Sequence, residues 1–192
     1  MSDVAFYFET GWHHIISWDA LDHILFIIAL AAIYQVQNWK QVIVLITAFT
    51  VGHSLTLALS VYDIIRFSEK WVEFLIPCTI IATAIFNFFV KKDNPKSLRI
   101  NYFLALFFGL IHGMGFANTI RFMLAKNQSI AIPLLSFNIG LEVGQIVVVT
   151  CILFISHILV NKLNLNRKWW VWSLSAIAIL SGLIMVKERW PL

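Results

Sequence analysis

Six long apolar runs dominate the sequence, and each is long enough to cross a lipid bilayer as a helix. A membrane-spanning helix needs about 20 mostly apolar residues. We therefore predict an all-α, polytopic membrane protein with six transmembrane helices joined by short loops. The runs cover about residues 18–36, 41–61, 71–90, 100–124, 130–160 and 169–186.

The composition excludes a water-soluble globular domain. Hydrophobic residues make up 60% of the 192 residues, charged residues make up 12%, and the mean hydropathy is +0.83. A soluble fold of this size needs a mostly polar exterior, which this chain cannot provide. Because the spans use nearly the whole length, we expect a single membrane domain over residues 1–192.

Basic residues in alternate loops predict how the helices are oriented. Eight of them lie in the loops on one side, and six lie on the other side. The positive-inside rule then places both termini outside the cytoplasm. Loop residues of this kind contact lipid head groups, so the net charge of +4 indicates the lipid bilayer as a partner and does not indicate nucleic acid.

The first 17 residues differ from the spans. They carry Asp3 and Glu9 among aromatic residues and contain no Lys or Arg, which does not fit the start of a cleavable signal peptide. We predict an interfacial segment over residues 1–17, formed either by a short helix or by a partly ordered tail. The run 130–160 would be about 46 Å long as a helix, so it should tilt or begin with a surface segment near Pro133.

Few ionisable residues lie within the apolar runs, and these few define the candidate site. An ionisable side chain that faces lipid costs several kcal/mol, so each should face the bundle interior. Counted along the helices, most fall within roughly 3 to 18 Å of one membrane face, and only His157 belongs to the opposite half. The residues that share a half are Asp22, His23, His53, Glu73, His112 and Glu142.

Three histidines and three carboxylates from five helices have the composition of a transition-metal site. Neutral imidazole and carboxylate suit several divalent ions, and the anionic charge offsets that of the metal in a low dielectric. We therefore predict a divalent transition metal ion, with nickel, zinc, cobalt and copper as the candidates. Glu73 is expected either to support the site or simply to lie at the membrane interface.

Other polar residues in the second and fifth runs could support such a site. Asn138, Glu142 and Gln145 follow the spacing i, i+4, i+7 and form one polar stripe, which must face protein or water. Ser54 follows His53 and bonds either to the second ring nitrogen of that histidine or to its own helix backbone. Two glycine pairs, at 109 and 113 and at 140 and 144, would let helices approach closely.

Four ordered motifs in these runs resemble the HupE/UreJ family of membrane proteins. They read DHILF at 22–26, FTVGHSLTL at 49–57, HGMGFA at 112–117 and FNIGLEVGQ at 137–145. The resemblance implies uptake of nickel or a related metal across the bacterial inner membrane. The metal contacts that it implies are Asp22, His23, His53, His112 and Glu142.

One position departs from the family pattern. Family members often carry a histidine six residues before the Asp-His pair, whereas His14 precedes Asp22 by eight. The prediction therefore leaves His14 out of the ligand set. We expect His13 and His14 to be solvated interfacial residues or a loose entry site.

Three functions remain compatible with these residues. A metal permease would capture a divalent ion in the outer half of the bundle and release it inward. An intramembrane zinc hydrolase would use three histidines as ligands and Glu142 or Asp22 as general base, and a metal sensor or assembly partner would bind without turnover.

We favour the permease and keep the hydrolase as the alternative, because the inner half offers few polar residues for a permeation path. Assembly into a homo-oligomer stays open. The polar residues of the inner half are Thr47, Asn87, Gln145, Thr150 and Ser156.

Overall fold

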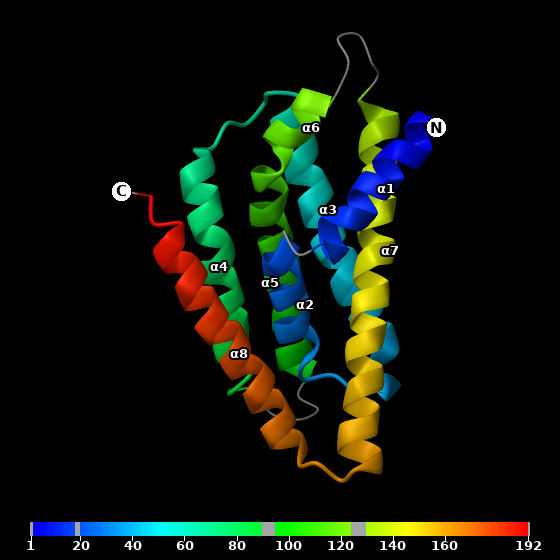
Figure 1. Cartoon of the computed structure of the whole chain (residues 1–192), viewed down its shortest axis with the longest axis vertical. Coiled ribbons are helices and arrows are strands. Elements are labelled where there is room, and N and C mark those ends of the chain that lie inside the picture. The colour runs from blue at the N-terminus through cyan, green and yellow to red at the C-terminus, as the bar shows by residue number, and fades with distance from the viewer. Residues whose placement is uncertain (1, 18–19, 90–94, 124–129, 192) are drawn as a thin grey trace.

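The computed structural model describes residues 2–17, 20–89, 95–123 and 130–191, without side chains for 95–99. Within these ranges the chain forms helices and no β-strand, which confirms the all-α fold class (Figure 1). The elements are α1 (Asp3–Ile16), α2 (Leu21–Ala31), η2 (Val36–Asn38), α3 (Trp39–Val61), α4 (Glu69–Phe86), α5 (Pro95–Gly115), α6 (Ala117–Met123), α7 (Ala131–Ser156), η3 (His157–Lys162) and α8 (Arg167–Glu188).

Among the described residues, three helical stretches are long and apolar enough to cross a membrane, namely Val36–Val61, Ala131–Lys162 and Arg167–Glu188. Two bent pairs raise the number to five: α1 with α2 at 66° and α5 with α6 at 46°. These stretches confirm a polytopic membrane protein. The predicted span 71–90 corresponds to α4, which has 18 residues but begins with the charged segment around Glu69. The predicted span ends at residues 18, 90 and 124 lie outside the described residues.

The longest apolar run forms one continuous helix. α7 passes directly into η3, a π-helical turn, and the backbone shows no break near Pro133. The helix is therefore continuous at this position, and whether its first turns lie at the membrane surface stays a prediction. Pro133 lies in the first turn of α7, where its missing N–H leaves no helical hydrogen bond unmade.

Segment 1–17 also forms regular structure. α1 is a helix of 14 residues that packs against α7 and buries Tyr7, Gly11 and Ile15. Of the two alternatives for this segment, the partly ordered tail is wrong. The position of α1 relative to the bilayer surface stays a prediction.

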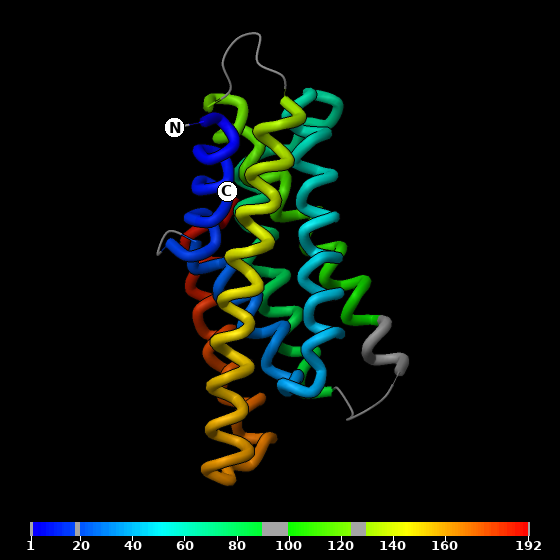
Figure 2. The backbone as a smooth tube through the Cα atoms, turned by 90° about the vertical axis from the view of Figure 1, so that its right-hand side faces the viewer, coloured from blue at the N-terminus to red at the C-terminus, as the bar shows by residue number. Residues whose placement is uncertain are grey.

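Two parallel helix pairs form much of the bundle. α1 and α7 both descend in Figure 1, whereas α3 and α5 both ascend, and Figure 2 shows the same directions from the side. α3 packs extensively on α5, and α1 packs extensively on α7. α2, α4 and α8 lie against these pairs and complete the bundle.

Glycines bring the backbones of the first pair into contact. A Cβ atom placed on Gly11 would lie 2.0 Å from the carbonyl oxygen of Phe137, and one placed on Gly140 would lie 2.1 Å from that of Phe8. Neither position has room for a side chain. Gly144 lies against Ile15 in the same interface, so the predicted close approach through the glycines at 140 and 144 is observed.

The second pair repeats this contact. A Cβ atom on Gly109 would lie 2.1 Å from the carbonyl oxygen of Phe49, and one on Gly52 would lie 2.3 Å from that of Leu106. In both pairs the carbonyl group belongs to the residue three positions before the partner's glycine. Gly113 also abuts the backbone of α3, as the glycine pair at 109 and 113 predicts.

The two pairs share a histidine position as well. His14 follows Gly11 by three residues in α1, and His112 follows Gly109 by three residues in α5. α1 and α5 run in opposite directions and each leads into a bent partner helix. The α1·α7 pair and the α5·α3 pair are thus built on one pattern with inverted orientation.

An ion-pair group closes the end of the bundle where α3 ends. Asp63, which has a positive φ of 63°, contacts Arg66 in its own loop and Arg121 of α6 at 3.2 Å. The Arg66 guanidinium holds the pKa of the Asp63 carboxyl below its usual value. This contact links the α3–α4 loop to α6, the short helix that follows the bend after α5.

Candidate metal site

Histidines from four helices meet near the middle of the bundle. One ring nitrogen each of His14, His23 and His53 lies within 4.8 Å of the other two. The ring of His112 is centred 4.9 Å from that of His23. His53 and His112 are 0% and 2% exposed, so both imidazoles are held away from solvent. We call these four residues the histidine cluster.

The glycine contacts position three of the four rings. His53 directly follows Gly52, and His112 and His14 each follow their glycine by three residues. Because α3 touches the backbone of α5, and α1 that of α7, these side chains have fixed axial positions. The fourth ring, that of His23, comes from α2, which is inclined at 66° to α1.

Hydrogen bonds orient two of the rings toward the centre of the cluster. Nδ1 of His112 donates to the carbonyl oxygen of Phe108 at 2.8 Å. A carbonyl oxygen only accepts, so the proton lies on Nδ1 and Nε2 keeps its lone pair. Nδ1 of His23 bonds to Oδ1 of Asp22 at 3.0 Å, an arrangement that frees Nε2 in metal-binding histidines.

The remaining ring nitrogens are buried and have no hydrogen-bond partner among the described residues. They are Nε2 of His14, His23 and His112 and both ring nitrogens of His53. Buried polar atoms without partners are rare in native proteins. A group of them from four helices has the composition of the donor set of a transition-metal site.

The spacing of the cluster suits a metal ion after a small contraction. An ion equidistant from three nitrogens 4.8 Å apart would lie about 2.8 Å from each, whereas zinc–imidazole bonds are about 2.1 Å long. Closure by less than about 1 Å would complete the coordination. The fourth imidazole, His112, is close enough to take part in the same movement.

Asp22 contacts the cluster from its edge. Its Oδ1 also accepts from the backbone N–H of His23 at 2.9 Å, and its Oδ2 accepts from Nη1 of Arg189 at 3.1 Å. Both carboxylate oxygens therefore have hydrogen-bond partners within the protein. In this arrangement Asp22 orients His23, and its role as a direct metal contact stays a prediction.

A cavity of about 150 Å³ leads from the cluster to the surface. Glu73 of α4 lines it and is exposed, so the predicted supporting carboxylate lies at its outer part. The lining residues are His14, His23, Glu73, Ile76, His112, Gly115, Phe116 and Arg189.

The polar stripe of α7 faces α3, as its spacing predicts. Oε1 of Glu142 accepts from Thr47 at 2.7 Å, and Oε1 of Gln145 accepts from Thr50 at 3.0 Å. Glu142 does not belong to the close group of donor atoms. Asn138 is nearer, because its side chain interacts with the ring of His53, and its buried Oδ1 has no partner.

Hydroxyl groups near His53 bond elsewhere. Ser54 donates to the carbonyl oxygen of Thr50 at 2.7 Å, and Thr56 donates to that of Gly52 at 3.1 Å. Of the two roles open to Ser54, the structure shows the bond to its own helix backbone. The ring of His53 is therefore held by packing, with Phe49 and Phe137 stacked beside it at 6.1 Å.

Three phenylalanines close the bundle beyond the cluster, on the side away from the ends of α3 and α5. Phe26 is centred 5.1 Å from Phe49 and 5.5 Å from Phe108, and all three are almost fully buried. Each lies three or four residues from a cluster histidine in its own helix, about one helical turn deeper. We call these residues the aromatic floor.

Two of the polar residues proposed for an inner path bond to nearby helix groups. Asn87 bonds to the carbonyl oxygen of Ala29 and to Ser175, and Thr150 bonds to its own helix at Ile146. These two side chains therefore serve helix packing, whereas Thr47 and Gln145 bond to Glu142 and Thr50 between α3 and α7.

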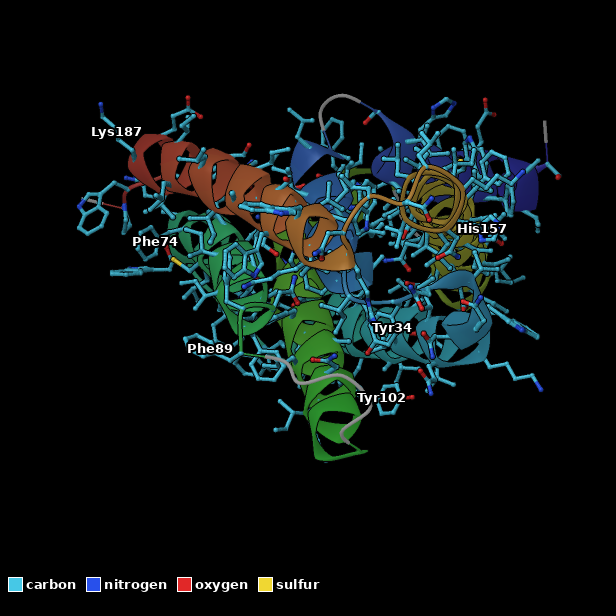
Figure 3. The ribbon with its side chains drawn as sticks, turned by 90° about the horizontal axis from the view of Figure 1, so that it is seen from below. Tyr34, Phe74, Phe89, Tyr102, His157 and Lys187 are labelled. Carbon is cyan, nitrogen blue, oxygen red and sulfur yellow. The ribbon has the colours of Figure 1, made fainter. Side chains whose placement is uncertain are left out.

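Two further histidines lie apart from the cluster. His13 is exposed and lies 3.7 Å from Glu9 on the same helix, as expected for a solvated residue. His157 begins η3 and bonds to Asn161 at 2.9 Å. Figure 3, seen from below, shows His157 at the near end of α7.

His14 and Arg189 are the site residues that the sequence reasoning missed. His14 is set apart from Asp22 along the chain, but the inclination between α1 and α2 brings it into the cluster. The signal that could have identified it is the Gly-x-x-His pattern shared by 11–14 and 109–112. The sequence placed Arg189 only among the basic loop residues that predict helix orientation.

Comparison with protein families gives a result consistent with this geometry. The family model described as "HupE / UreJ protein" matches residues 1–189. The chain belongs to the HupE/UreJ family. This is a family of bacterial membrane transporters for nickel and cobalt, and the histidine cluster is compatible with such cargo. Searches among curated proteins and solved structures gave no match.

Proposed function

We propose that this protein is a permease for a divalent transition metal, with nickel or cobalt as cargo, in the bacterial cytoplasmic membrane. The observation that carries the proposal is the histidine cluster: ring nitrogens from four helices are buried and unpartnered among the described residues, and three of the four histidines line a cavity. The membrane helices and the family membership support transport as the use of these donors.

The ligand chemistry fits a cargo that must be released. Neutral imidazoles bind nickel, cobalt and zinc well, and a proton competes with the metal for the same ring nitrogen, so binding to imidazole is reversible. Asp22 supplies a single buried anionic group next to His23. We infer that the ion enters past Glu73, exchanges water for imidazole nitrogen, and leaves when the bundle opens on the other side.

The hydrolase alternative has less support. A hydrolytic site needs a carboxylate placed to act as general base on metal-bound water. Glu142 bonds to Thr47 and is absent from the donor group, and Asp22 is occupied by His23 and Arg189. We therefore favour transport. The orientation of the termini outside the cytoplasm and assembly into a homo-oligomer remain predictions.

Uptake of radioactive nickel into proteoliposomes tests the proposal. We expect saturable uptake by the wild type, at least a tenfold loss in His53→Ala, and little change in His157→Ala, which removes a histidine outside the cluster. Elemental mass spectrometry of the purified proteins measures retained metal in parallel. Equal uptake by the two variants, or uptake no faster than in empty liposomes, would contradict the proposal.

A further inference from the structure

The cavity that leads to the histidine cluster already contains a cationic side chain. Arg189, the residue that ends α8, lines the cavity together with three of the four histidines. Its Nη1 lies 3.1 Å from Oδ2 of Asp22, and its side chain is only 27% exposed. The guanidinium charge also acts on His112. A permanent positive charge thus lies where a metal ion would enter.

Packing on both sides of Arg189 holds this end of α8 against α4. The ring of Trp190 meets that of Phe74 edge to face at 5.2 Å. Gly182, two turns earlier, lies against Ile81 and leaves no room for a larger residue. Figure 3 shows the same neighbourhood, with Lys187 and Phe74 on one side of the molecule. The guanidinium therefore has a fixed base from which it reaches Asp22.

We propose that Arg189 acts as a tethered competitor of the transported cation, an inference that rests on the proposed metal transport. In the empty protein its guanidinium neutralises Asp22, the buried carboxylate next to His23. When a divalent ion binds the imidazoles, it approaches a guanidinium that stays positively charged because it cannot be deprotonated. Arg189 therefore weakens metal binding and favours release of the ion.

A second carboxylate gives the guanidinium an alternative position. Glu73 lines the same cavity from α4, nearer the surface than Asp22. Arginine has five N–H donors and no acceptor, so it cannot ligate the metal and must be satisfied by oxygen atoms. When the ion takes up the charge of Asp22, Glu73 is the carboxylate to which Arg189 can move.

A purely structural ion pair would have the opposite effect on affinity. If Arg189 only held Asp22 and the ring of His23 in place, its removal would disorder a ligand and weaken metal binding. If it competes with the metal, its removal strengthens binding. The sign of the change in Kd therefore separates the two roles.

Nickel titration of purified protein, by equilibrium dialysis with elemental mass spectrometry, tests the inference. We expect Arg189→Gln to lower the Kd at least tenfold and to slow nickel release into excess chelator by a similar factor. Arg189→Lys keeps the charge and should stay within about threefold of wild type. Lys187→Gln, a neighbouring charge outside the cavity, should have no effect.

The outcomes separate this inference from the proposed function. If wild type binds nickel through His53 but Arg189→Gln binds equally or more weakly, competition by Arg189 is wrong and the metal site stands. If neither protein binds nickel, both proposals fail. Thermal unfolding of each variant shows that the fold is intact, and Arg189→Lys provides the charge-retaining comparison if the Gln variant is unstable.

Discussion

Each histidine ring has two nitrogens, and the hydrogen bond of one determines whether the other is oriented to bind a metal. His112 and His23 have theirs engaged by Phe108 and Asp22, so their free nitrogens are aimed before any metal arrives. Both nitrogens of His53 have no hydrogen-bond partner among the described residues, and its ring packs against Phe49 and Phe137 next to the side chain of Asn138. Pre-oriented ligands reduce the cost of binding, so we infer that His53 is the ring that the metal itself must orient.

A substitution at His14 tests the contribution of α1 to the site. We expect His14→Ala to weaken nickel binding at least tenfold, because it removes one imidazole from the close group of donors. His13→Ala should stay within about twofold, since that exposed ring contacts only Glu9. Competition with a chromogenic chelator measures both. Equal effects of the two substitutions would show that α1 contributes no ligand.

The sequence predicted single site residues best where a polar side chain lies within an apolar, membrane-spanning run. His23, His53 and His112 could be singled out because a polar ring in an apolar run needs a partner or a role, and the structure brings these three together. Arg189 could not be assigned to the site, because a charge at a helix end normally faces solvent. Its reach into the cavity depends on the packing of Trp190 on α4.

Each glycine contact joins two helices through their backbones. In a membrane, helix association depends on close packing, since lipid is as apolar as the side chains, and small residues at the interface are therefore decisive. The contacts of Gly11 with Phe137 and of Gly109 with Phe49 leave no space for a methyl group. We infer that each pair behaves as one rigid unit.

Alanine substitutions test that rigidity. Gly140→Ala should destabilise the protein by about 1–3 kcal/mol or more, because the new methyl group would overlap the backbone of Phe8. Gly115→Ala should be tolerated, since its Cβ would meet only Ile76 and Val72 at ordinary contact distances of 3.4 and 3.5 Å. Thermal unfolding in detergent compares them, and equal midpoints would refute tight packing at Gly140.

The helices themselves were more predictable than their partners. Apolar length predicted the helical runs, since hydropathy reports the solvent around a segment. It could not predict the bend at Phe116 or the continuity of α7 past Pro133, which depend on local backbone geometry. The sequence also could not predict that α1 packs against α7, because glycines on one side of a helix do not specify which other helix will pack there.

At the scale of the whole molecule, the cluster is accessible from one direction. The cavity connects it with the surface at Glu73, and the aromatic floor closes the bundle below it. We infer that Phe26, Phe49 and Phe108 block the way of an ion bound to the histidines. Transport requires a second state in which the floor is open.

Disulfide cross-links test whether the two helix pairs move against each other. In a protein lacking Cys78 and Cys151, Thr50→Cys with Gln145→Cys would join α3 to α7, where the native side chains meet at 3.0 Å. We expect at least tenfold slower nickel uptake, restored by reduction. The control is Ile15→Cys with Gly144→Cys inside the α1·α7 pair, where the Cβ atoms would lie about 3.1 Å apart.

The control disulfide should leave uptake nearly unchanged, because it joins helices that we expect to move together. Uptake unaffected by a fully formed α3–α7 disulfide would show that the pairs do not separate during transport. Mass spectrometry of the unreduced protein measures how completely each disulfide forms.

The inverted repetition of the helix pairs offers a way for the protein to reach this second state. Two halves with the same pattern and opposite directions can exchange conformations, and an exchange of this kind turns the opening of the molecule from one side of the membrane to the other. His14 and His112 occupy equivalent positions in the two halves, so the same imidazoles could hold the ion in both states. The same helix contacts would then stabilise both the conformation open to one side of the membrane and the conformation open to the other.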